Sequence, residues 1–340
     1  MIESKKKLVL VLNDTRVDLH HGCHRVMTCI DQEFSRNGNA NCIFIPAHQV
    51  NMLTPAIREL IKKSQLVLIN GEGTFHHDSI SGKKLLDVGL YAKSLGKKVA
   101  FINATWQGNS VEALSALAEF DYVAVRESLS GNELMAAGVK HKVVPDLSLY
   151  NLEPNIGGDE VDVVLYGDSV KRKDASVLLG QCLGDEAGEF FPISLTYNSF
   201  LDGLRLLRRQ YCRLDLKSVR RLRQTTWLSL NIILRKINKH DDFLKKLSQS
   251  CGVVSGRFHL VCMAIGLSVP FLCMESNSHK IQGLLIDVGL EGRMVDKKDI
   301  KKRIKNIKFS ECELRKIERY REVANMRISL MFEDIGRLLG

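Results

Sequence analysis

An arginine and a histidine two residues apart follow an apolar strand in the C-terminal half of the chain. The segment CGVVSGRFH (251–259) reads as a strand that ends in the tight turn Ser255-Gly256, with Arg257 and His259 at the start of the helix that follows. The unpaired amides of a helix N-terminus favour an anion, and a guanidinium group suits a carboxylate or a phosphate. Imidazole gives or takes a proton near neutral pH. These residue types indicate an acid-base site for an acidic ligand; the alternative is that both side chains only cap the helix.

The next predicted strand, 269–275, ends in a second polar loop. This loop begins with Glu275 and continues as SNS (276–278), and Lys280 follows. Neighbouring parallel strands end at the same edge of a sheet, where ligands bind in open α/β folds. We therefore expect the hydroxyl, amide and ammonium groups of this loop to lie beside Arg257.

The order of these motifs resembles that of the polysaccharide pyruvyl transferase family. The C-terminal domain of that family carries an S-x-R-[LF]-H segment, an A-x-x-x-G-x-P strand entry and a following lysine. The corresponding segments of this chain are SGRFH (255–259), AIGLSVP (264–270) and Lys280.

A second group of family motifs lies in the middle of the chain. The family shows an R-[DE]-x-x-S segment, then G-[VI], then a V-x-D strand end. In this chain they correspond to RESLS (126–130), GV (138–139) and VPD (144–146). The resemblance runs over most of the sequence, and the ordered pair of motif groups is more specific than either group alone.

The resemblance implies a glycosyltransferase B-like fold and transfer of a pyruvyl ketal from phosphoenolpyruvate to a sugar diol, with no metal and no further cofactor. The donor carries a carboxylate and a phosphate, which accounts for Arg126, Arg257 and a helix N-terminus. Its enol carbon must be protonated before a hydroxyl can add, and His259 matches the acid of the family. Two hydroxyls then add in turn as phosphate leaves. The predicted donor-binding residues are Arg257, Arg126, Ser255, Ser276, Asn277 and Lys280.

The N-terminal strand ends differ from the family pattern. Many members have a GGG segment and an N-G-D segment, whereas this chain has NGEGTFHHD (70–78) and, after the first strand, Asn13-Asp14 and HHGCHR (20–25). We interpret Glu72 and Asp14 as catalytic candidates that bind the acceptor sugar or remove its proton. The other predicted acceptor-side residues are His21, His77 and Asp78. In the alternative interpretation, the histidine pairs are solvated loop residues.

The same segments argue against other ligand classes. No HxH or HExxH spacing occurs, so we predict no metal site. The turn from Gly71 to Gly73 lacks the GxGxxG and GK[ST] signatures, which disfavours dinucleotide or P-loop binding. An arginine at a helix N-terminus would also suit an activated sugar, so a glycosyltransferase that uses a nucleotide-activated sugar is the main alternative. A non-catalytic scaffold of polysaccharide synthesis is a third.

The pattern of apolar segments predicts an α/β protein with two Rossmann-like domains that face a cleft. Short apolar strands alternate with helical segments, as is typical of a parallel sheet covered on both faces. The polar segment 151–160 reads as a linker, after which the strand pattern restarts. The predicted units are an acceptor-side domain (1–152), a donor-side domain (160–308) with a basic helical region (203–240), and a C-terminal helix (309–340).

The formal net charge of +10 is not spread evenly over the 340 residues. Arginine and lysine are dense in the segment 204–240, where Trp227 and many leucines and isoleucines interleave with them. Such a segment attracts anionic surfaces, so its open interpretations are a solvated basic helix and a peripheral contact with an anionic membrane. We predict no nucleic-acid partner, because no nucleic-acid-binding module accompanies the charge.

Cysteine usage and hydropathy indicate the compartment. Nine cysteines without any CxxC pair are typical of reduced thiols in the cytosol, and no run of about 18 uncharged apolar residues is present to span a membrane. We therefore expect a cytoplasmic protein, and the family resemblance implies a transferase of bacterial capsule, exopolysaccharide or O-antigen synthesis. Its expected partners are a small anionic donor and a saccharide or lipid-linked saccharide acceptor. Peripheral association with the inner face of the plasma membrane remains open.

Overall fold

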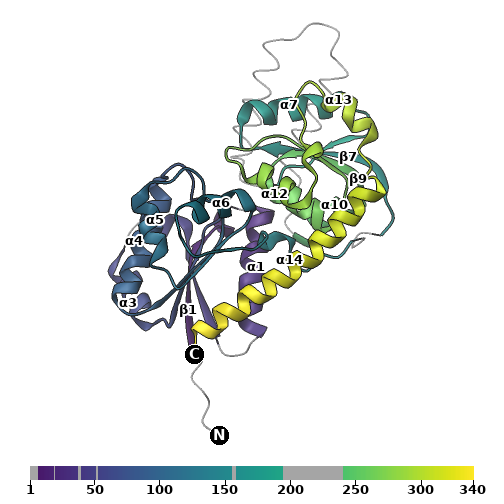
Figure 1. Cartoon of the computed structure of the whole chain (residues 1–340). Helices are drawn as coiled ribbons and strands as arrows, with labels where there is room; N and C mark the ends of the chain where they lie inside the picture. Colours follow the sequence, from purple (N-terminus) through teal and green to yellow (C-terminus); the bar gives the residue numbers. More distant parts are fainter. Residues whose placement is uncertain (1–6, 19, 37–39, 51–52, 155–157, 194–239) are drawn as a thin grey trace.

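Two parallel β-sheets, each covered by helices on both faces, form the two lobes of the molecule (Figure 1). The computed structural model describes residues 7–340 except 19, 37–39, 51–52, 155–157 and 194–239. The predicted α/β class with parallel sheets is confirmed. The predicted basic region 203–240 lies outside the described residues, except for His240.

The first sheet has the strand order β2-β1-β3-β4-β5-β6, and its paired strands are parallel. Successive side chains of a strand point to opposite faces. In β1, Leu10 and Leu12 accordingly pack into one core and Val9 and Val11 into the other. The strands are β1 (Lys7–Asp14), β2 (Ala40–Pro46), β3 (Leu66–Asn70), β4 (Lys98–Ala104), β5 (Tyr122–Val125) and β6 (Lys142–Val143).

Helices bury an apolar stripe on each face of this sheet. One face is covered by α3 (Pro55–Lys63), α4 (Ile80–Ser94) and α5 (Val111–Ala118). The opposite face is covered by α1 (His21–Arg36) and by part of the C-terminal helix. The short elements of this lobe are η1 (Arg16–Asp18), α2 (Ala47–Val50), α6 (Ser128–Ala136) and η2 (Leu147–Leu149).

The second sheet has the order β10-β9-β7-β8, and its paired strands are also parallel. Its strands are β7 (Val161–Ser169), β8 (Gly188–Phe190), β9 (Ser250–Gly256) and β10 (Phe271–Cys273). One face packs against α10 (His240–Gln249), α11 (Phe258–Gly266) and α12 (Lys280–Val288). The other face packs against α7 (Arg172–Leu183) and α13 (Ile300–Arg303).

The helix α14 (Glu311–Leu338) crosses from one lobe to the other (Figure 1). It begins with a capping box, in which the Ser310 side chain accepts from the Glu313 amide and the Glu313 side chain accepts from the Ser310 amide. Ile317 packs into the core of the second sheet, whereas Ile328 packs into the core of the first. This helix therefore fixes how the two sheets face each other.

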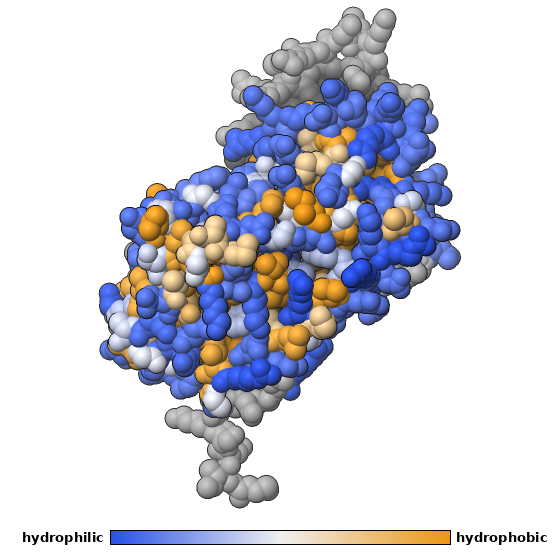
Figure 2. Space-filling view, in the orientation of Figure 1, coloured by the Kyte–Doolittle hydropathy of each residue, from blue (hydrophilic) through white to orange (hydrophobic). Residues whose placement is uncertain are grey.

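On the face drawn in Figure 2, small groups of apolar residues are separated by hydrophilic ones. Within the described part of the chain, we find no helix that is both long and apolar enough to cross a bilayer.

Candidate active site

A cavity of about 490 Å³ lies between the carboxyl ends of the two sheets. Loops that follow strands of both sheets contribute to its walls. Among the described lining residues, Arg126, Arg257 and Lys280 are cationic and Glu72 carries a carboxylate. An excess of positive groups in a partly enclosed cleft attracts anionic ligands.

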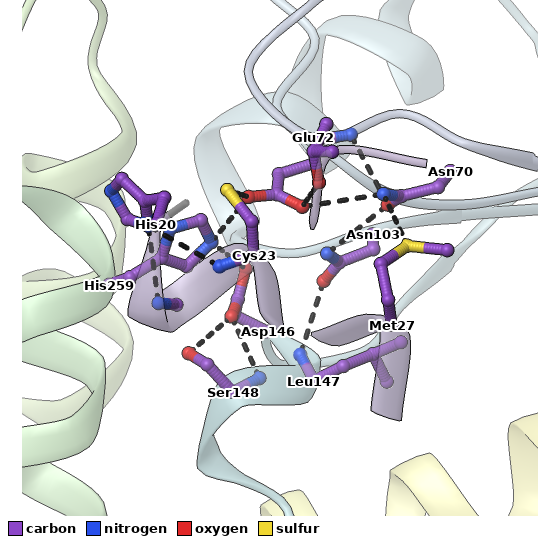
Figure 3. Close-up of polar contacts among 12 residues, drawn as sticks. His20, Cys23, Met27, Asn70, Glu72, Asn103, Asp146, Leu147, Ser148 and His259 are labelled. Atoms are coloured by element: carbon purple, nitrogen blue, oxygen red, sulfur yellow. Dashed lines mark hydrogen bonds and ion pairs between the residues drawn. The ribbon is translucent and has the colours of Figure 1, made fainter. Parts of the chain in front are cut away.

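His259, in the first turn of α11, lies at the junction of the two lobes (Figure 3). Its Nε2 is 3.3 Å from Oε1 of Glu72 and 3.5 Å from Oδ2 of Asp146, and both carboxylates belong to the first lobe. The side chain is only 8 % exposed, and Nε2 has no hydrogen bond of good geometry to any described residue. A buried, unsatisfied ring nitrogen that lines a cavity is a group placed to act on a ligand.

The approach of His259 to the first lobe depends on a glycine in α1. A Cβ atom at Gly22 would lie 2.3 Å from Cβ and 2.4 Å from Cγ of His259, closer than atoms can pack. The sequence HHGC thus lets the start of α1 press directly against the imidazole of the other lobe.

Glu72 is held in place by several donors. Its Oε2 accepts hydrogen bonds from Thr15 Oγ1 at 2.9 Å and from Asn70 Nδ2 at 3.3 Å. Its Oε1 accepts from Cys23 Sγ at 2.8 Å (Figure 3). The carboxylate that faces His259 is therefore preorganised.

Arg126 is 1 % exposed and pairs with the buried Asp146 at 2.9 Å, and it also donates to Thr105 Oγ1 at 2.8 Å. Its guanidinium lies 4.1 Å from the centroid of the Phe258 ring. Burial by itself would raise the pKa of Asp146, but the charges of His259 and Arg126 and the hydrogen bond from Ser148 hold that pKa well below its usual range. Asp146 therefore stays ionised and ties together the arginine and the histidine of the site.

Arg257 is the N-cap residue of α11 and pairs with the buried Asp168, with distances of 2.8 Å from Nε and 2.6 Å from Nη2. Its backbone amide donates to Ser255 Oγ, which in turn donates to the carbonyl of Asp168. Ser255, predicted as a donor-binding residue, is 1 % exposed, and its hydroxyl orients the turn beneath the cavity. In this structure the Ser255 hydroxyl contacts the backbone of Arg257 and Asp168, and donor binding by Ser255 stays a prediction.

Lys280 begins α12 and lines the cavity. Its Nζ donates to Asn277 Oδ1 at 2.8 Å, and Ser276 Oγ donates to the same oxygen at 3.2 Å. Burial lowers the pKa of Lys280 to about 7, helped by the charges of Arg126 and Arg257. Among the described residues no carboxylate lies within ion-pair distance of this ammonium group, so its charge is available to a ligand.

Two of the residues predicted on the acceptor side are engaged outside the cavity lining. Asp14 forms an ion pair with Arg16 at 2.7 Å and also accepts the Arg16 amide. His21 is 4 % exposed and stacks on Phe243, with ring centroids 4.1 Å apart. Burial lowers the pKa of His21 to about 4, which keeps the ring neutral inside this aromatic contact. Both residues therefore stabilise the structure around the cavity.

The other two acceptor-side predictions also lie outside the lining. His77 and Asp78 have positive φ angles in a tight turn, with the His77 amide bonded to the Gln107 carbonyl. Asp78 accepts the amide of Ser110, the N-cap residue of α5, and lies 3.4 Å from Lys83 Nζ. The Asp78 carboxylate thus stabilises the N-terminus of α5.

Among the polar residues that line the cavity without having been predicted are His20 and Cys23. Together with His259, they place potential metal-ligand atoms within 4.8 Å of one another, the only such group found among the described residues. The HHGCHR segment pointed to this region of the sequence. Which of His20 and His21 faces the cavity depends on the residue at which α1 begins, and the sequence alone did not show that. Asp168, the partner of Arg257 near the end of β7, was also missed.

Sequence comparison gives one family. The family model described as polysaccharide pyruvyl transferase matches residues 18–278, which is most of the chain. A comparison with curated proteins gave no match.

Solved structures with the same fold cover both lobes. A putative UDP-N-acetylglucosamine 2-epimerase from Listeria monocytogenes aligns with a TM-score of 0.55 and 11 % identity over 97 % of this chain and 95 % of that one. The UDP-GlcNAc 2-epimerase of Methanocaldococcus jannaschii, in complex with UDP-GlcNAc and UDP, aligns with a TM-score of 0.50 and 13 % identity over 98 % and 99 %. These similarities establish the glycosyltransferase B-like fold of two Rossmann-like domains.

Proposed function

This chain belongs to the polysaccharide pyruvyl transferase family, and from this premise we propose that it transfers a pyruvyl group from phosphoenolpyruvate to a sugar diol. The product would be a cyclic ketal on a precursor of a bacterial surface polysaccharide. The observation that carries the proposal is His259, whose unsatisfied Nε2 lies between two carboxylates in a cavity lined by three cationic side chains.

Donor binding is assigned to the cationic wall of the cavity. A phosphoenolpyruvate molecule carries a carboxylate and a phosphate, and charge-assisted hydrogen bonds to such groups are the strongest available. We assign these hydrogen bonds to Arg257, Lys280 and the first amides of α11. The positive charge of the buried Arg126 also attracts the anionic donor. Asn277 and Ser276 orient the ammonium group of Lys280.

The proton steps are assigned to His259 and Glu72. His259 gives a proton to the methylene carbon of the donor, and the positive character that develops on the neighbouring carbon is quenched by the first sugar hydroxyl. Glu72 accepts the proton of that hydroxyl. The bond to the phosphate oxygen then breaks, and the second hydroxyl adds to the same carbon. One hydroxyl proton thus replaces the proton given to the methyl group, and the other leaves with inorganic phosphate.

The reaction is tested with phosphoenolpyruvate and a panel of sugar diols from surface polysaccharide precursors. We expect release of inorganic phosphate together with a new ketal methyl signal in the proton NMR spectrum. Arg257→Ala should weaken donor binding, whereas His259→Ala should abolish transfer and spare binding, each with an unchanged circular dichroism spectrum. Full activity of either variant would remove its residue from the site.

A second candidate is glycosyl transfer from a nucleotide-activated sugar, because the solved structures of the same fold include one in complex with UDP-GlcNAc and UDP. The two candidates differ in the ligand that stabilises the protein. Thermal stabilisation by UDP or CMP, with none by phosphoenolpyruvate, would favour glycosyl transfer. If neither ligand raised the melting temperature, the non-catalytic scaffold would become the preferred function.

The place of action follows from the proposed acceptor. We propose that the protein works in the cytoplasm on a saccharide or a lipid-linked saccharide. The segment 204–240 would hold it at the anionic inner face of the plasma membrane. Support for this location comes from the charge of that segment in the sequence.

A further inference from the structure

The imidazole of His20 caps the helix α1. Its Nδ1 accepts the backbone amides of Gly22 at 3.1 Å and of Cys23 at 3.3 Å (Figure 3). These are the second and third residues of α1 (His21–Arg36), so the ring occupies the position of an N-cap acceptor.

This capping role fixes the tautomer of the ring. An imidazole nitrogen that accepts a hydrogen bond cannot carry a proton, so in the neutral ring the proton must be on Nε2. Protonation of Nδ1 would break both caps and would place a positive charge at the positive end of the helix dipole. Burial together with the charges of His259 and Arg257 also lowers the pKa of His20 well below its usual range. His20 is therefore a neutral N–H donor over the physiological pH range.

The donor faces the cavity at the point where the reaction is proposed. His20 lines the cavity, and its ring centroid is 5.3 Å from that of His259, edge to face. Arg257 and Lys280 line the same cavity. The side of the ring that carries Nε2 is the one not used by the amides of α1.

We propose that His20 contacts the donor substrate and gives an uncharged hydrogen bond from Nε2–H to one of its anionic oxygens. The inference rests on the proposed function, because it takes phosphoenolpyruvate as the ligand. A neutral donor can stabilise the oxygen without competing with His259 for a proton. Removal of one such bond to a charged group should weaken donor binding about 10- to 100-fold.

A bound metal ion is the other interpretation of the group formed by His20, Cys23 and His259. Zinc would take two imidazoles and a thiolate. However, the lone pair of Nδ1 is used by two amides of α1, and Cys23 Sγ donates to Glu72. The hydrogen bonds therefore favour the donor role, and metal binding becomes an outcome of the test.

Two substitutions separate the two nitrogens of the ring. In His20→Asn, the side-chain oxygen can still cap α1, but the group corresponding to Nε2–H is lost. In His20→Gln, the amide nitrogen can reach the position of Nε2, but the cap is lost. His24→Asn, at an exposed position of the same helix, is the matched control. The dissociation constant of phosphoenolpyruvate is measured by calorimetry, and the melting temperature is measured in parallel.

We expect His20→Asn to keep its melting temperature and to bind the donor about 10- to 100-fold more weakly, by the same factor at about pH 6 and about pH 8.5. His20→Gln should lose melting temperature but keep most of the affinity, and His24→Asn should behave as wild type. Wild-type affinity in His20→Asn would overturn the inference, as would a deficit present at only one pH. The proposed function itself would fail separately, through the absence of donor binding by the wild-type protein.

Zinc binding by His20→Asn and by two cysteine variants decides the metal interpretation. One zinc ion bound per wild-type chain, and lost in both His20→Asn and Cys23→Ser but not in Cys29→Ser, would show that the ring nitrogen is a ligand and would overturn the donor role. No such zinc binding would support it.

Discussion

At the residue scale, Lys280 is a cavity group whose charge changes near neutral pH. Its pKa is lowered to about 7, first by burial and then by Arg126 and Arg257. Only the ammonium form attracts an anion, so we expect the affinity for phosphoenolpyruvate to fall as the pH rises through about 7. Calorimetric titrations at several pH values would measure the fall. Lys280→Arg should lack this fall, because a guanidinium group stays charged over this range.

The phosphate of the donor also titrates near this pH, and the Lys280→Arg variant controls for it because the same donor is used with both proteins.

The stability of the fold should change with pH in the opposite direction to donor binding. The pKa of Lys280 is lower in the folded than in the unfolded chain, so the unfolded chain binds more protons above about pH 7 and stability rises from there toward the usual lysine pKa. If the affinity for phosphoenolpyruvate changed with pH in the same way in the wild type and in Lys280→Arg, Lys280 would not hold the donor.

The sequence located the chemistry of the second lobe better than that of the first. Arg257 and His259 follow one strand directly, so the strand end alone placed them near the cavity. In the HHGC segment, by contrast, a choice between His20 and His21 decides whether a ring faces the cavity or stacks on Phe243. That choice depends on where α1 begins and on contacts with the other lobe, which no local pattern contains.

At the scale of elements, the contact between α1 and α11 is set by Gly22. A methyl group there would meet the His259 side chain at 2.3 Å, so we expect Gly22→Ala to displace the imidazole. The strain of inserting one methylene-sized group into a packed site is about 1–3 kcal/mol, and the gain in helix propensity offsets about 1 kcal/mol of it. We therefore expect Gly22→Ala to lose most of its transfer activity, whereas its free energy of unfolding should fall by no more than about 2 kcal/mol.

The matched control for this substitution is Gly180→Ala in α7, where a Cβ atom meets nothing within 4 Å. We expect it to stabilise the protein by about 0.5–1 kcal/mol in urea unfolding and to leave transfer unchanged. If Gly22→Ala retained wild-type transfer, the close approach of α1 to His259 would not matter for the reaction.

Among the strands predicted from apolar periodicity are those buried on both faces. β1, β3 and β4 are nearly continuous runs of buried aliphatic residues, which a parallel sheet requires. β8 and α7 were not predicted. β8 has three half-buried residues, and α7 mixes lysine and aspartate with few core residues. Both gain their order from packing against β7, which is a long-range contact that the local sequence does not reveal.

At the scale of the whole molecule, one helix holds the two lobes together. The amphipathic pattern at the C-terminus predicted a long helix, and α14 extends from Glu311 to Leu338. Its apolar stripe is shared between two different cores, with Ile317 in one and Ile328 and Met331 in the other. The spacing of apolar residues predicts the helix. It does not predict that the apolar residues of this helix pack into the cores of two different sheets, which is visible only in the structure.

The charge of the whole molecule comes from one segment. Residues 204–240 contain 11 of the 49 lysines and arginines and 1 of the 39 acidic residues, so the remainder of the chain holds 38 of each and has no net charge. If the protein associates with anionic membranes, we expect this segment to supply most of the attraction. We expect it to sediment with vesicles that contain phosphatidylserine or phosphatidylglycerol, and we expect salt to reverse the association because exposed charges are screened beyond about 10 Å at 0.1 M salt.

Charge reversal at two places tests whether membrane binding depends on the segment 204–240 or only on the net charge of the protein. The variant Arg220→Glu, Arg221→Glu, Arg223→Glu changes the segment, and Lys301→Glu, Lys302→Glu, Lys305→Glu makes the same change at exposed positions around α13. Each polybasic contact contributes about 1 kcal/mol, so three reversals should abolish sedimentation in the first variant. The second should pellet as wild type. Equal loss in both variants would show an unspecific attraction by total charge, and pelleting of the wild type with neutral vesicles at high salt would remove the electrostatic basis of the contact.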